Sequence, residues 1–576
     1  MRFNWLCTSR VLAAIAAIAA GLGCGDSGSG GAGGGGGPSS GGSHAGGGGA
    51  SQGGGGADPT CSDQPPAAPV LVSPSSGAVG VVPDALSIEL GAFSDPDGGD
   101  YAGAEIEIWS DTQGAPKARV WHIALGASDS AVGVLLAAGT WDDPQVAALD
   151  PWEDYLIRAR WISSQDGCTA PGAYSEFSVF KTDDGSAYLF DESQIRDYYL
   201  EIPQESMDAM NAEAYPPGCV PFTRSYHTAK LTFEGQTFDG IGVKIKGGCG
   251  SARDLYHKTA FKINLSWDDP AVPGCPADRR LFGLKHLTLN NGVEDRSATH
   301  ERLAYRLFRE LGVPAPRIAH ARVFVNGELY GLYQNVETVD RRFLDRWFGS
   351  KEGMLYEGTY YCDLVPGNLP PTETDDGCLT REFTPSACST PDPAGDPLTY
   401  GPVTEFVNQI QAIPDGQFYA QAPAFLNLDE FLDAWAVAAL TGYWDGYWYD
   451  LNNNYRVYHD PSTGLWSVIS TGLDQTFESV NMDPFAVTGI LGQKCIADSA
   501  CFAALVERVK AVRDVYVADD LGAAASAIAA QIDPYVQADP RREYSYQTYL
   551  DFQSYLQDFI ASRPDIVDQY IQSYGF

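Results

Sequence analysis

Histidine and basic residues are scarce in this sequence of 576 residues. Its 8 histidines include no pair at the spacing of zinc ligands, so a zinc hydrolase is not expected. The 37 Lys and Arg residues are outnumbered by 74 Asp and Glu, which leaves a formal net charge of −37. Because nucleic-acid phosphates bind a basic protein face, we expect neither DNA nor RNA as a partner.

The cysteines lack the CxxC spacing of thioredoxins and zinc ribbons, although 12 of them are present. Those beyond Cys24 are even in number, which favours disulfide bonds in an oxidising compartment over a catalytic thiol. The sequence leaves the connectivity open, but Cys61–Cys168 and Cys495–Cys501 are the local pairs that we expect.

Long apolar runs are also rare, and the one from residue 11 to residue 22 is shorter than the ~20 residues of a transmembrane helix. It follows basic residues and ends at Gly-Leu-Gly-Cys, which resembles a bacterial lipobox. We therefore expect a signal peptide over residues 1–23 and a lipid on Cys24 that anchors the protein to a membrane. Ordinary signal-peptide cleavage, with Cys24 incidental, is the alternative. The expected location is the bacterial cell envelope, outside the cytoplasm, at the outer membrane or the cell surface.

Residues 25–57 contain 19 glycines and a single charged side chain, Asp26. Apart from Pro38, no apolar side chain larger than alanine occurs there, so the segment has almost nothing to bury and is not expected to fold. Chains rich in glycine and serine behave as coils, and one of this length reaches roughly 30 Å. We interpret residues 24–62 as a tether between the anchor and a folded body.

Hydrophobic residues make up 44% of the chain and aromatics 12%, which is enough for a large core. From residue 63 to residue 182, short alternating segments are separated by Gly, Pro, Asp and Ser, a rhythm that predicts a β-sandwich. Residues 149–160 and 174–177 resemble parts of a fibronectin type III domain, a class of module that serves as a spacer or a binding platform. Asp-Pro-Asp-Gly at 95–98 is typical of a tight acidic turn, with a calcium loop as the alternative.

The second body, residues 183–576, is predicted to be an α+β domain with two lobes, so the chain as a whole is multidomain. In its first half, residues 243–246 and 260–265 alternate like paired strands, and Asn326-Gly327 is a strong hairpin signal. A helix with one apolar stripe is predicted over residues 297–311. The second half is richer in helix, with segments predicted over residues 428–441, 503–517, 523–538 and 544–570.

A glycine-rich turn, Lys246-Gly-Gly-Cys-Gly-Ser251, closes the predicted strand pair. Its backbone N–H groups could approach an anion closely, although it is not a Walker A loop. Lys258 and Lys262 follow at an even spacing that places both on one face of the next strand, where they could neutralise phosphate charge. The alternative is a simple turn beside an exposed strand face that carries lysines.

A second set of polar residues lies between residues 444 and 477. Asp445 ends a helical stretch, a run of asparagines follows, and Asp474 lies just beyond a hairpin predicted around residues 460–464. Carboxylate and amide oxygens brought together in this way suit magnesium, and protein kinases use the same order of an Asp, an Asn and a second Asp. Acidic residues beside aromatics also suit sugar binding, which stays open from the pattern alone.

Several short motifs follow one another in the second body, at residues 243–247 with Ser251, 258–263, 282–291, 301–304, 312–317, 325–333 and 337, and around Asp445, Asn454 and Asp474. With this series the chain, from about residue 189 to the C-terminus, resembles the CotH (spore-coat protein H) kinase family of secreted or surface-bound atypical kinases. The resemblance implies a kinase-like fold with ATP between the lobes and Mg²⁺ as cofactors. It also implies transfer of the γ-phosphoryl group to Ser or Thr hydroxyls of an extracytoplasmic protein.

The resemblance assigns roles to the polar residues of the centre. Asp445 matches the catalytic aspartate, Asp474 matches the magnesium-binding aspartate, and Asn454 or its neighbour Asn453 matches the second metal ligand.

It also assigns the residues near the nucleotide. Lys258 matches the lysine that contacts phosphate, with Lys262 as the runner-up and Lys246 nearby. Glu337 falls where the chain links the lobes, and it would touch the nucleotide or brace the hinge. Glu301 would pair with the lysine, with a solvated helix residue as the alternative.

One departure from the family pattern stands two residues before Asp474, where Gly472 replaces a frequent aspartate. It keeps open a rival function, a kinase-like scaffold or binding lipoprotein with impaired catalysis. A third alternative is a kinase that phosphorylates a small polyol or sugar.

Overall fold

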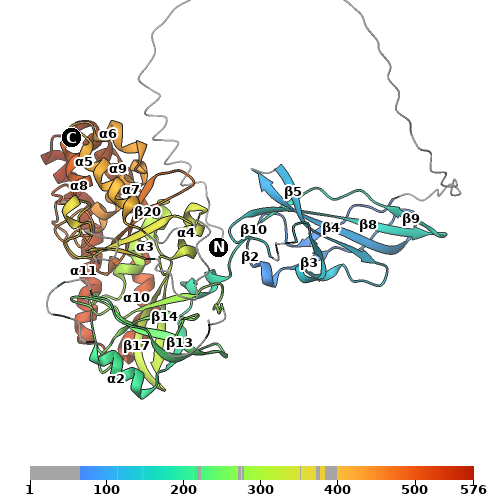
Figure 1. Ribbon diagram of the computed structural model, residues 1–576, viewed down its shortest axis with the longest axis horizontal. Helices are drawn as coiled ribbons and strands as arrows, with labels where there is room; N and C mark the ends of the chain where they lie inside the picture. The colour runs from blue at the N-terminus through green and yellow to red at the C-terminus, as the bar shows by residue number, and fades with distance from the viewer. Residues whose placement is uncertain are drawn as a thin grey trace, which may run out of the picture. The chain divides into compact units, whose positions relative to one another are not determined.

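The computed structural model describes residues 65–112, 115–144, 146, 148–213, 216, 219, 222–269, 274, 278–350, 352–370, 377–382 and 399–576. The chain divides into two compact units, Met1–Thr182 and Asp183–Phe576 (Figure 1). The expected signal peptide, the lipidated Cys24, the tether and Cys61 lie outside the described residues and stay predictions. Among the helices described, none combines the length and the apolar character needed to cross a membrane.

The first unit contains two β-sheets that share one hydrophobic core. Ile88, Ile106 and Trp121, from strands of both sheets, are fully buried in it. The segments expected to be strands between residues 86 and 161 are strands, and the expected acidic turn forms, with Asp97 N–H donating to Asp95 Oδ1. The relation to fibronectin type III domains stays a prediction. One sheet has the order β1 (Leu71–Ser73), β3 (Ser87–Leu90), β6 (Val132–Leu135); the other runs β2 (Ala78–Val81), β10 (Ser178–Thr182), β8 (Asp154–Gln165), β4 (Asp100–Thr112), β5 (Ala115–Gly126), β7 (Thr140–Trp141), with β9 (Cys168–Pro171) on β8.

The second unit begins with a closed seven-stranded barrel, whose closure the sequence did not predict. A parallel pair between β11 and β16 completes the ring, and a parallel partner far along the chain leaves no local sequence signal. The predicted hairpin is confirmed: Asn326 and Gly327 both have positive φ and join β16 to β17. The order is β11 (Arg196–Glu201), β12 (His227–Phe233), β13 (Gln236–Lys246), β14 (Ala260–Asn264), β15 (His286–Asn290), β17 (Glu328–Val336), β16 (Ile318–Val325).

A helical part follows the barrel and is built around α7 (Leu428–Thr441), which is almost wholly buried. Helix α3 (His300–Glu310) belongs to the same core, and the predicted helical segments from residue 428 onward are confirmed. A four-stranded sheet, β19 (Leu379–Arg381), β18 (Met354–Gly358), β20 (Tyr455–His459), β21 (Trp466–Ser470), lies in this part. The other helices include α2 (Gln204–Ala212), α4 (Arg341–Phe348), α5 (Gly401–Ala412), α6 (Phe418–Gln421), α8 (Ile490–Ala497), α9 (Ser499–Ala518), α10 (Leu521–Ala538) and α11 (Tyr546–Ser573).

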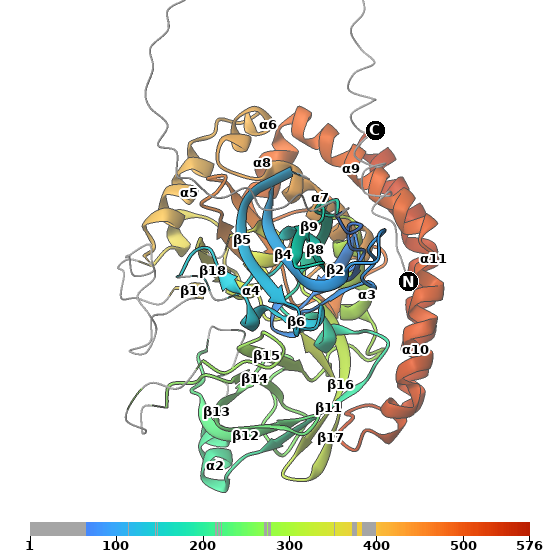
Figure 2. The ribbon, with the colours of Figure 1, turned by 90° about the vertical axis from the view of Figure 1, so that its right-hand side faces the viewer.

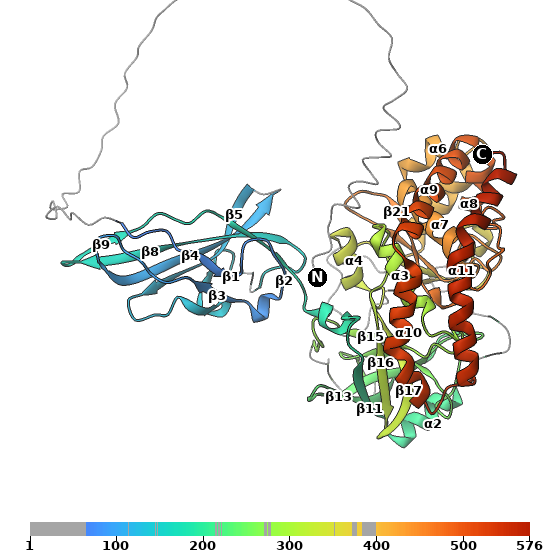
Figure 3. The ribbon, with the colours of Figure 1, turned by 180° about the vertical axis from the view of Figure 1, so that it is seen from behind.

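The last two helices extend back along the barrel, with α10 beside β16 and β17 (Figures 2 and 3). Three disulfide bonds lie among the described residues of this unit. The expected Cys495–Cys501 bond is confirmed, and Cys219–Cys249 and Cys362–Cys378 are additional. Cys168 is also disulfide-bonded.

Candidate functional site

Asp445 lies just beyond the C-terminus of α7, where Gly442 ends the helix in the left-handed conformation. The side chain is 4% exposed and accepts two amide hydrogen bonds, from Asn454 Nδ2 to Oδ2 at 2.7 Å and from Asn453 Nδ2 to Oδ1 at 3.2 Å. Burial raises the pKa of Asp445 to about 7, Asp474 adds to this effect, and the two asparagines oppose it. The structure therefore brings together the four polar residues that the sequence predicted for the centre.

Asp474 is half-buried in a short 3₁₀ turn (Leu473–Gln475) that begins three residues after the end of β21. Burial raises the pKa of its carboxyl group, and Lys246 opposes this rise. Lys246 is the last residue of β13, and it interacts electrostatically with Glu301 as well as with Asp474. This lysine thus links the end of the barrel to the carboxylates of the centre.

Glu301 projects from α3 and is 1% exposed, so the alternative of a solvated helix residue is wrong. Asn290, at the end of β15, donates its amide to both carboxylate oxygens, at 3.2 and 3.0 Å. Burial raises the pKa of Glu301 to about 8, Asp474 adds to the rise, and Asn290 and Lys246 oppose it. The lysine that interacts electrostatically with Glu301 is Lys246, whereas Lys258 pairs with Asp539.

Lys258 is not on the next strand, because β14 begins only at Ala260. Its buried ammonium group donates to Asp539 Oδ2 at 2.7 Å, in an ion pair whose two side chains are 8% and 2% exposed. The ion pair joins Lys258 to the segment after α10 rather than to Asp445 or Asp474. The expected phosphate contact of Lys258 stays a prediction.

Lys262 does lie on β14, opposite Lys244 of β13. Burial acts to lower the pKa of Lys262, but Glu382 and Glu357 outweigh it and raise the pKa. Both glutamates also accept from Arg456 of β20, at 3.0 and 2.8 Å. Lys262 thus faces an ionic group on the four-stranded sheet.

Glu337 follows β17 and is 3% exposed. Its carboxylate accepts from the guanidinium groups of Arg317, at 2.7 Å, and Arg346, at 2.5 Å, and also from the Arg317 N–H. Burial acts to raise the pKa of Glu337, but the two arginines outweigh it and lower the pKa to about 2. Of the two roles expected for Glu337, bracing the segment that links the lobes fits a carboxylate with two arginine partners better than a contact with the nucleotide does.

Three acidic residues near the centre were not predicted from the sequence: Glu294, Asp295 and Glu478. Burial, together with Asp474 and Asp445, raises the pKa of Glu294 to about 8. Burial, Asp295 and Asp474 likewise raise the pKa of Glu478 to about 7. The adjacent acids at 294 and 295, between an Asn-rich strand end and α3, were a signal that could have been used.

Gly472 adopts a left-handed conformation, with φ of 62°, and its N–H donates to Tyr305 Oη. A Cβ atom at this position would lie 2.6 Å from Asn454 Oδ1, much closer than a non-bonded contact allows. The glycine therefore permits Asn454 to sit between Asp445 and the Asp474 segment. The structure around position 472 therefore has no room for the aspartate that is frequent there in the family.

The donor set at the centre fits magnesium, which binds carboxylate and amide oxygens. Asp474 and Asn454 would supply such oxygens, and the raised pKa of Asp474 reflects burial, to which the charge of Asp295 adds. In the described part of the chain, no three or more His, Cys, Asp or Glu side chains form a ready-made metal cage. Magnesium in kinase sites needs none, because one or two protein ligands act together with substrate phosphates.

Comparison with known protein families shows the family to which this chain belongs. Residues 243–567 match the family described as CotH kinase protein, and this range covers Lys246, Asp445 and Asp474. The chain belongs to this family. The matched range begins within β13 and ends within α11, so it includes the glycine-rich turn and most of the helical part.

Two CotH relatives show how far the similarity extends. Invasin CotH2 of Rhizopus delemar is 24% identical over 305 residues, which are 51% of this chain and 44% of the invasin. Inner spore coat protein H of Bacillus subtilis is 22% identical over 301 residues, which are 50% of this chain and 76% of that protein. The chain thus spans less than half of the invasin. A solved structure, the proinflammatory kinase CtkA of Helicobacter pylori, aligns with 60% of this chain and 95% of its own at 10% identity and a TM-score of 0.21.

Proposed function

We propose that this CotH family member is an envelope-anchored atypical kinase. It transfers the γ-phosphoryl group of ATP to Ser or Thr hydroxyls of an extracytoplasmic protein. The observation that carries the proposal is the assembly of Asp445, Asn454 and Asp474 with Lys246 and Glu301, inside the range matched by the family. The location outside the cytoplasm rests on the expected anchor at Cys24, and it agrees with relatives named as an invasin and a spore-coat protein.

Asp445 is the residue that takes the proton of the acceptor hydroxyl. A carboxyl group with a pKa near 7 is suited to exchange protons at neutral pH, and the two asparagine amides fix its orientation. As the hydroxyl oxygen attacks the γ-phosphorus atom, the bond to the β,γ-bridging oxygen breaks, and ADP carries away the negative charge. The proton passes from the hydroxyl to a carboxylate oxygen of Asp445.

Lys246 is the residue that contacts the phosphates in this proposal, and Glu301 orients it. The pairing of a strand lysine with a helix glutamate follows the logic of protein kinases, in which the pair holds the phosphates in register with the catalytic aspartate. Magnesium held by Asp474 and Asn454 would neutralise charge on the phosphate oxygens. Lys258 and Glu337, in contrast, stabilise the fold through their ion pairs.

The test uses the full chain with labelled ATP and Mg²⁺, alone and with candidate acceptor proteins. We expect label transfer by the wild type and its loss in Asp445→Ala. The matched control is Asp429→Ala, since Asp429 is an exposed carboxylate in the first turn of α7, far from the catalytic loop. Equal labelling by wild type and Asp445→Ala would contradict the proposal. Binding of ATP without any transfer would favour the scaffold, and labelling of a polyol or sugar alone would favour the small-molecule kinase.

A further inference from the structure

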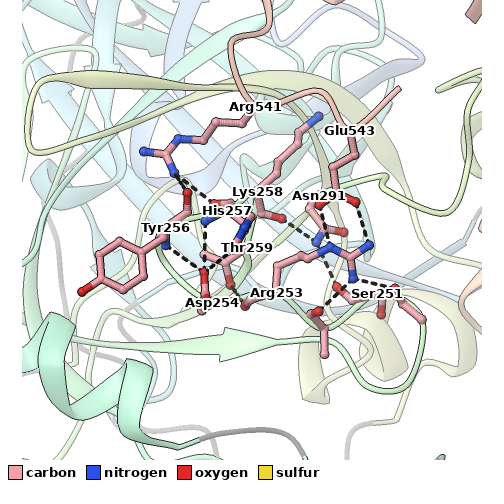
Figure 4. A network of polar contacts seen from close by, with 12 residues as sticks. Ser251, Arg253, Asp254, Tyr256, His257, Lys258, Thr259, Asn291, Arg541 and Glu543 are labelled. Carbon is pink, nitrogen blue, oxygen red and sulfur yellow. Dashed lines mark hydrogen bonds and ion pairs between the residues drawn. The ribbon is translucent and has the colours of Figure 1, made fainter. Parts of the chain in front are cut away.

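The segment that joins α10 to α11, residues 539–545, lies against the connection between β13 and β14. This connection contains the glycine-rich turn and continues to Thr259. Figure 4 shows the contact, in which side chains from the helical hairpin reach residues 253–258 of the barrel. Because the two segments are almost 300 residues apart, no sequence pattern predicted that they meet.

The central contact is an ion pair between Arg253 and Glu543. The guanidinium group donates to both carboxylate oxygens, from Nε at 2.6 Å and from Nη2 at 2.7 Å. Its remaining nitrogen, Nη1, donates to the backbone oxygens of Gly250 and Ala252, both at 2.8 Å. Glu543 therefore orients Arg253 (Figure 4). Arg253 in turn holds the carbonyl groups of Gly250 and Ala252.

Neighbouring contacts fasten the same connection to the hairpin. Asp539, directly after α10, accepts from Lys258 Nζ at 2.7 Å and from the N–H of Leu332 in β17 at 3.0 Å. Arg541 donates to three successive backbone oxygens, of residues 255 to 257. Residues 255–258 of the β13–β14 connection are thus held by the bonds of Asp539 and, separately, by those of Arg541.

The carbonyl oxygens of the glycine-rich turn accept hydrogen bonds from other residues of the protein. Gly247 O accepts from Arg224 at 2.7 Å, Gly248 O accepts from Ser251 at 3.0 Å, and Gly250 O accepts from Arg253. Asn291 donates to the oxygen of Ser251 at 3.1 Å. In the described part of the chain, the N–H groups of residues 248–250 make no hydrogen bond, so they stay available to an anion.

The turn also lies close to the catalytic carboxylates. Gly250 approaches Glu294 so closely that a side chain at position 250 would collide with the carboxylate. Glu294 in turn interacts electrostatically with Asp445 and Asp474, and it accepts from Gln475 at 3.1 Å. The free N–H groups of the turn are therefore near the place where the proposed function puts the phosphates.

We propose that Arg253 is a positioning residue for nucleotide binding, and that Glu543 of the C-terminal hairpin holds it in its working orientation. The inference rests on the proposed kinase function and adds a second anchor for the phosphate-binding turn, supplied by the last helices of the chain. Arg253 acts through the carbonyl of Gly250, which it turns away from the cleft, so that the N–H groups of the turn face the nucleotide. A bidentate pair fixes direction as well as charge, which a lysine could not do.

The test is Glu543→Gln in the full chain, with the apparent KM for ATP, the KM for the acceptor, kcat and the thermal midpoint measured together. Loss of a charge-assisted pair costs about 1.4 kcal/mol, so we expect the KM for ATP to rise about tenfold. The KM for the acceptor and kcat at saturating ATP should change less than twofold. Arg253→Lys, which keeps the charge and removes the fork, should raise the KM for ATP by the same amount.

The matched control is Asp568→Asn, which breaks an equivalent pair between Arg513 and Asp568 on α9 and α11. Its side chains are 27% and 33% exposed, against 26% and 32% for Arg253 and Glu543. The control should lower the thermal midpoint as much as Glu543→Gln does and leave the KM for ATP unchanged. An unchanged KM for ATP in Glu543→Gln, or an equal rise in the control, overturns the positioning role while the kinase activity of the wild type stands. Absence of ATP binding by the wild type itself overturns the proposed function and this inference together.

Discussion

Asn454 donates its side-chain amide to Oδ2 of Asp445 over 2.7 Å. The other end of the same amide group, Oδ1, lies 2.6 Å from the position that a Cβ atom of residue 472 would occupy. One asparagine therefore connects the loop after α7 with the segment that carries Asp474. The arrangement depends on a residue without a side chain at position 472.

Gly472→Asp, which restores the frequent family residue, should impair the protein rather than activate it. The new Cβ atom would lie 2.6 Å from Asn454 Oδ1, and an aspartate would also be strained at a φ of 62°. We expect at least a tenfold loss of labelling activity, measured with labelled ATP. Gly464→Asp separates the two effects, because Gly464 has a similar φ of 72° and no atom within 4 Å of the added Cβ. The control should lose stability through strain and keep its activity; a fully active Gly472→Asp would contradict the assigned role of the glycine.

Lys246→Met should abolish the binding of Mg-ATP, whereas Lys258→Met should lower the stability of the fold. Removal of Lys246 takes a cation from the phosphate site, so the thermal shift produced by Mg-ATP should disappear while the fold persists. Removal of Lys258 leaves Asp539 buried without its counter-charge, which we expect to lower the free energy of unfolding by about 3 kcal/mol. The measurement is thermal unfolding with and without Mg-ATP. Loss of the shift in Lys258→Met alone would restore the original assignment of the phosphate lysine.

The sequence predicted local elements well and their long-range partners poorly. The periodic apolar pattern located α7 and the helices after it, and Asn-Gly located the turn at residues 326–327. The closure of the barrel through β11 and β16 depends on a pairing between distant segments, which leaves no local pattern. The contact between residues 253 and 543 was unpredictable for the same reason.

The candidate site likewise contains residues that were predicted from one local stretch and contacts between distant residues that were not predicted. Asp445, the asparagines and Asp474 were identified because they lie in one short stretch with a hairpin between them. The sequence could not show which of the three lysines has a carboxylate partner, because spacing along a chain does not reveal contacts between distant residues. Asp539, which binds Lys258, is 281 residues away from it.

Asp474→Asn tests the magnesium ligand. The substitution keeps the size of the side chain and removes the negative charge, so the apparent affinity for Mg²⁺ should fall at least tenfold. We expect the Mg²⁺ concentration that gives half-maximal ATP-dependent thermal stabilisation to rise accordingly. Asp483→Asn is the control, since Asp483 caps Phe485 and accepts from Tyr574 further along the chain. An unchanged Mg²⁺ dependence in Asp474→Asn would remove this residue from the metal site.

The buried group of Glu337 with Arg317 and Arg346 makes stability depend on acid pH. The pKa of Glu337 falls from its ordinary value of 4.5 to about 2, because the two arginines outweigh the effect of burial. A carboxyl group whose pKa is lowered on folding stabilises the protein at pH values above its ordinary pKa. Here the contribution is about 3 kcal/mol, and it is lost as the pH falls toward 2.

The free energy of unfolding of the wild type should therefore exceed that of Glu337→Gln by a difference that is constant above pH 5. This gap should shrink between pH 4.5 and pH 2 in denaturant titrations. The control, Glu234→Gln, removes an exposed partner of Arg196, and its gap should stay near zero throughout. A gap for Glu337→Gln that is independent of pH would show that the arginines do not hold the carboxylate in its charged form.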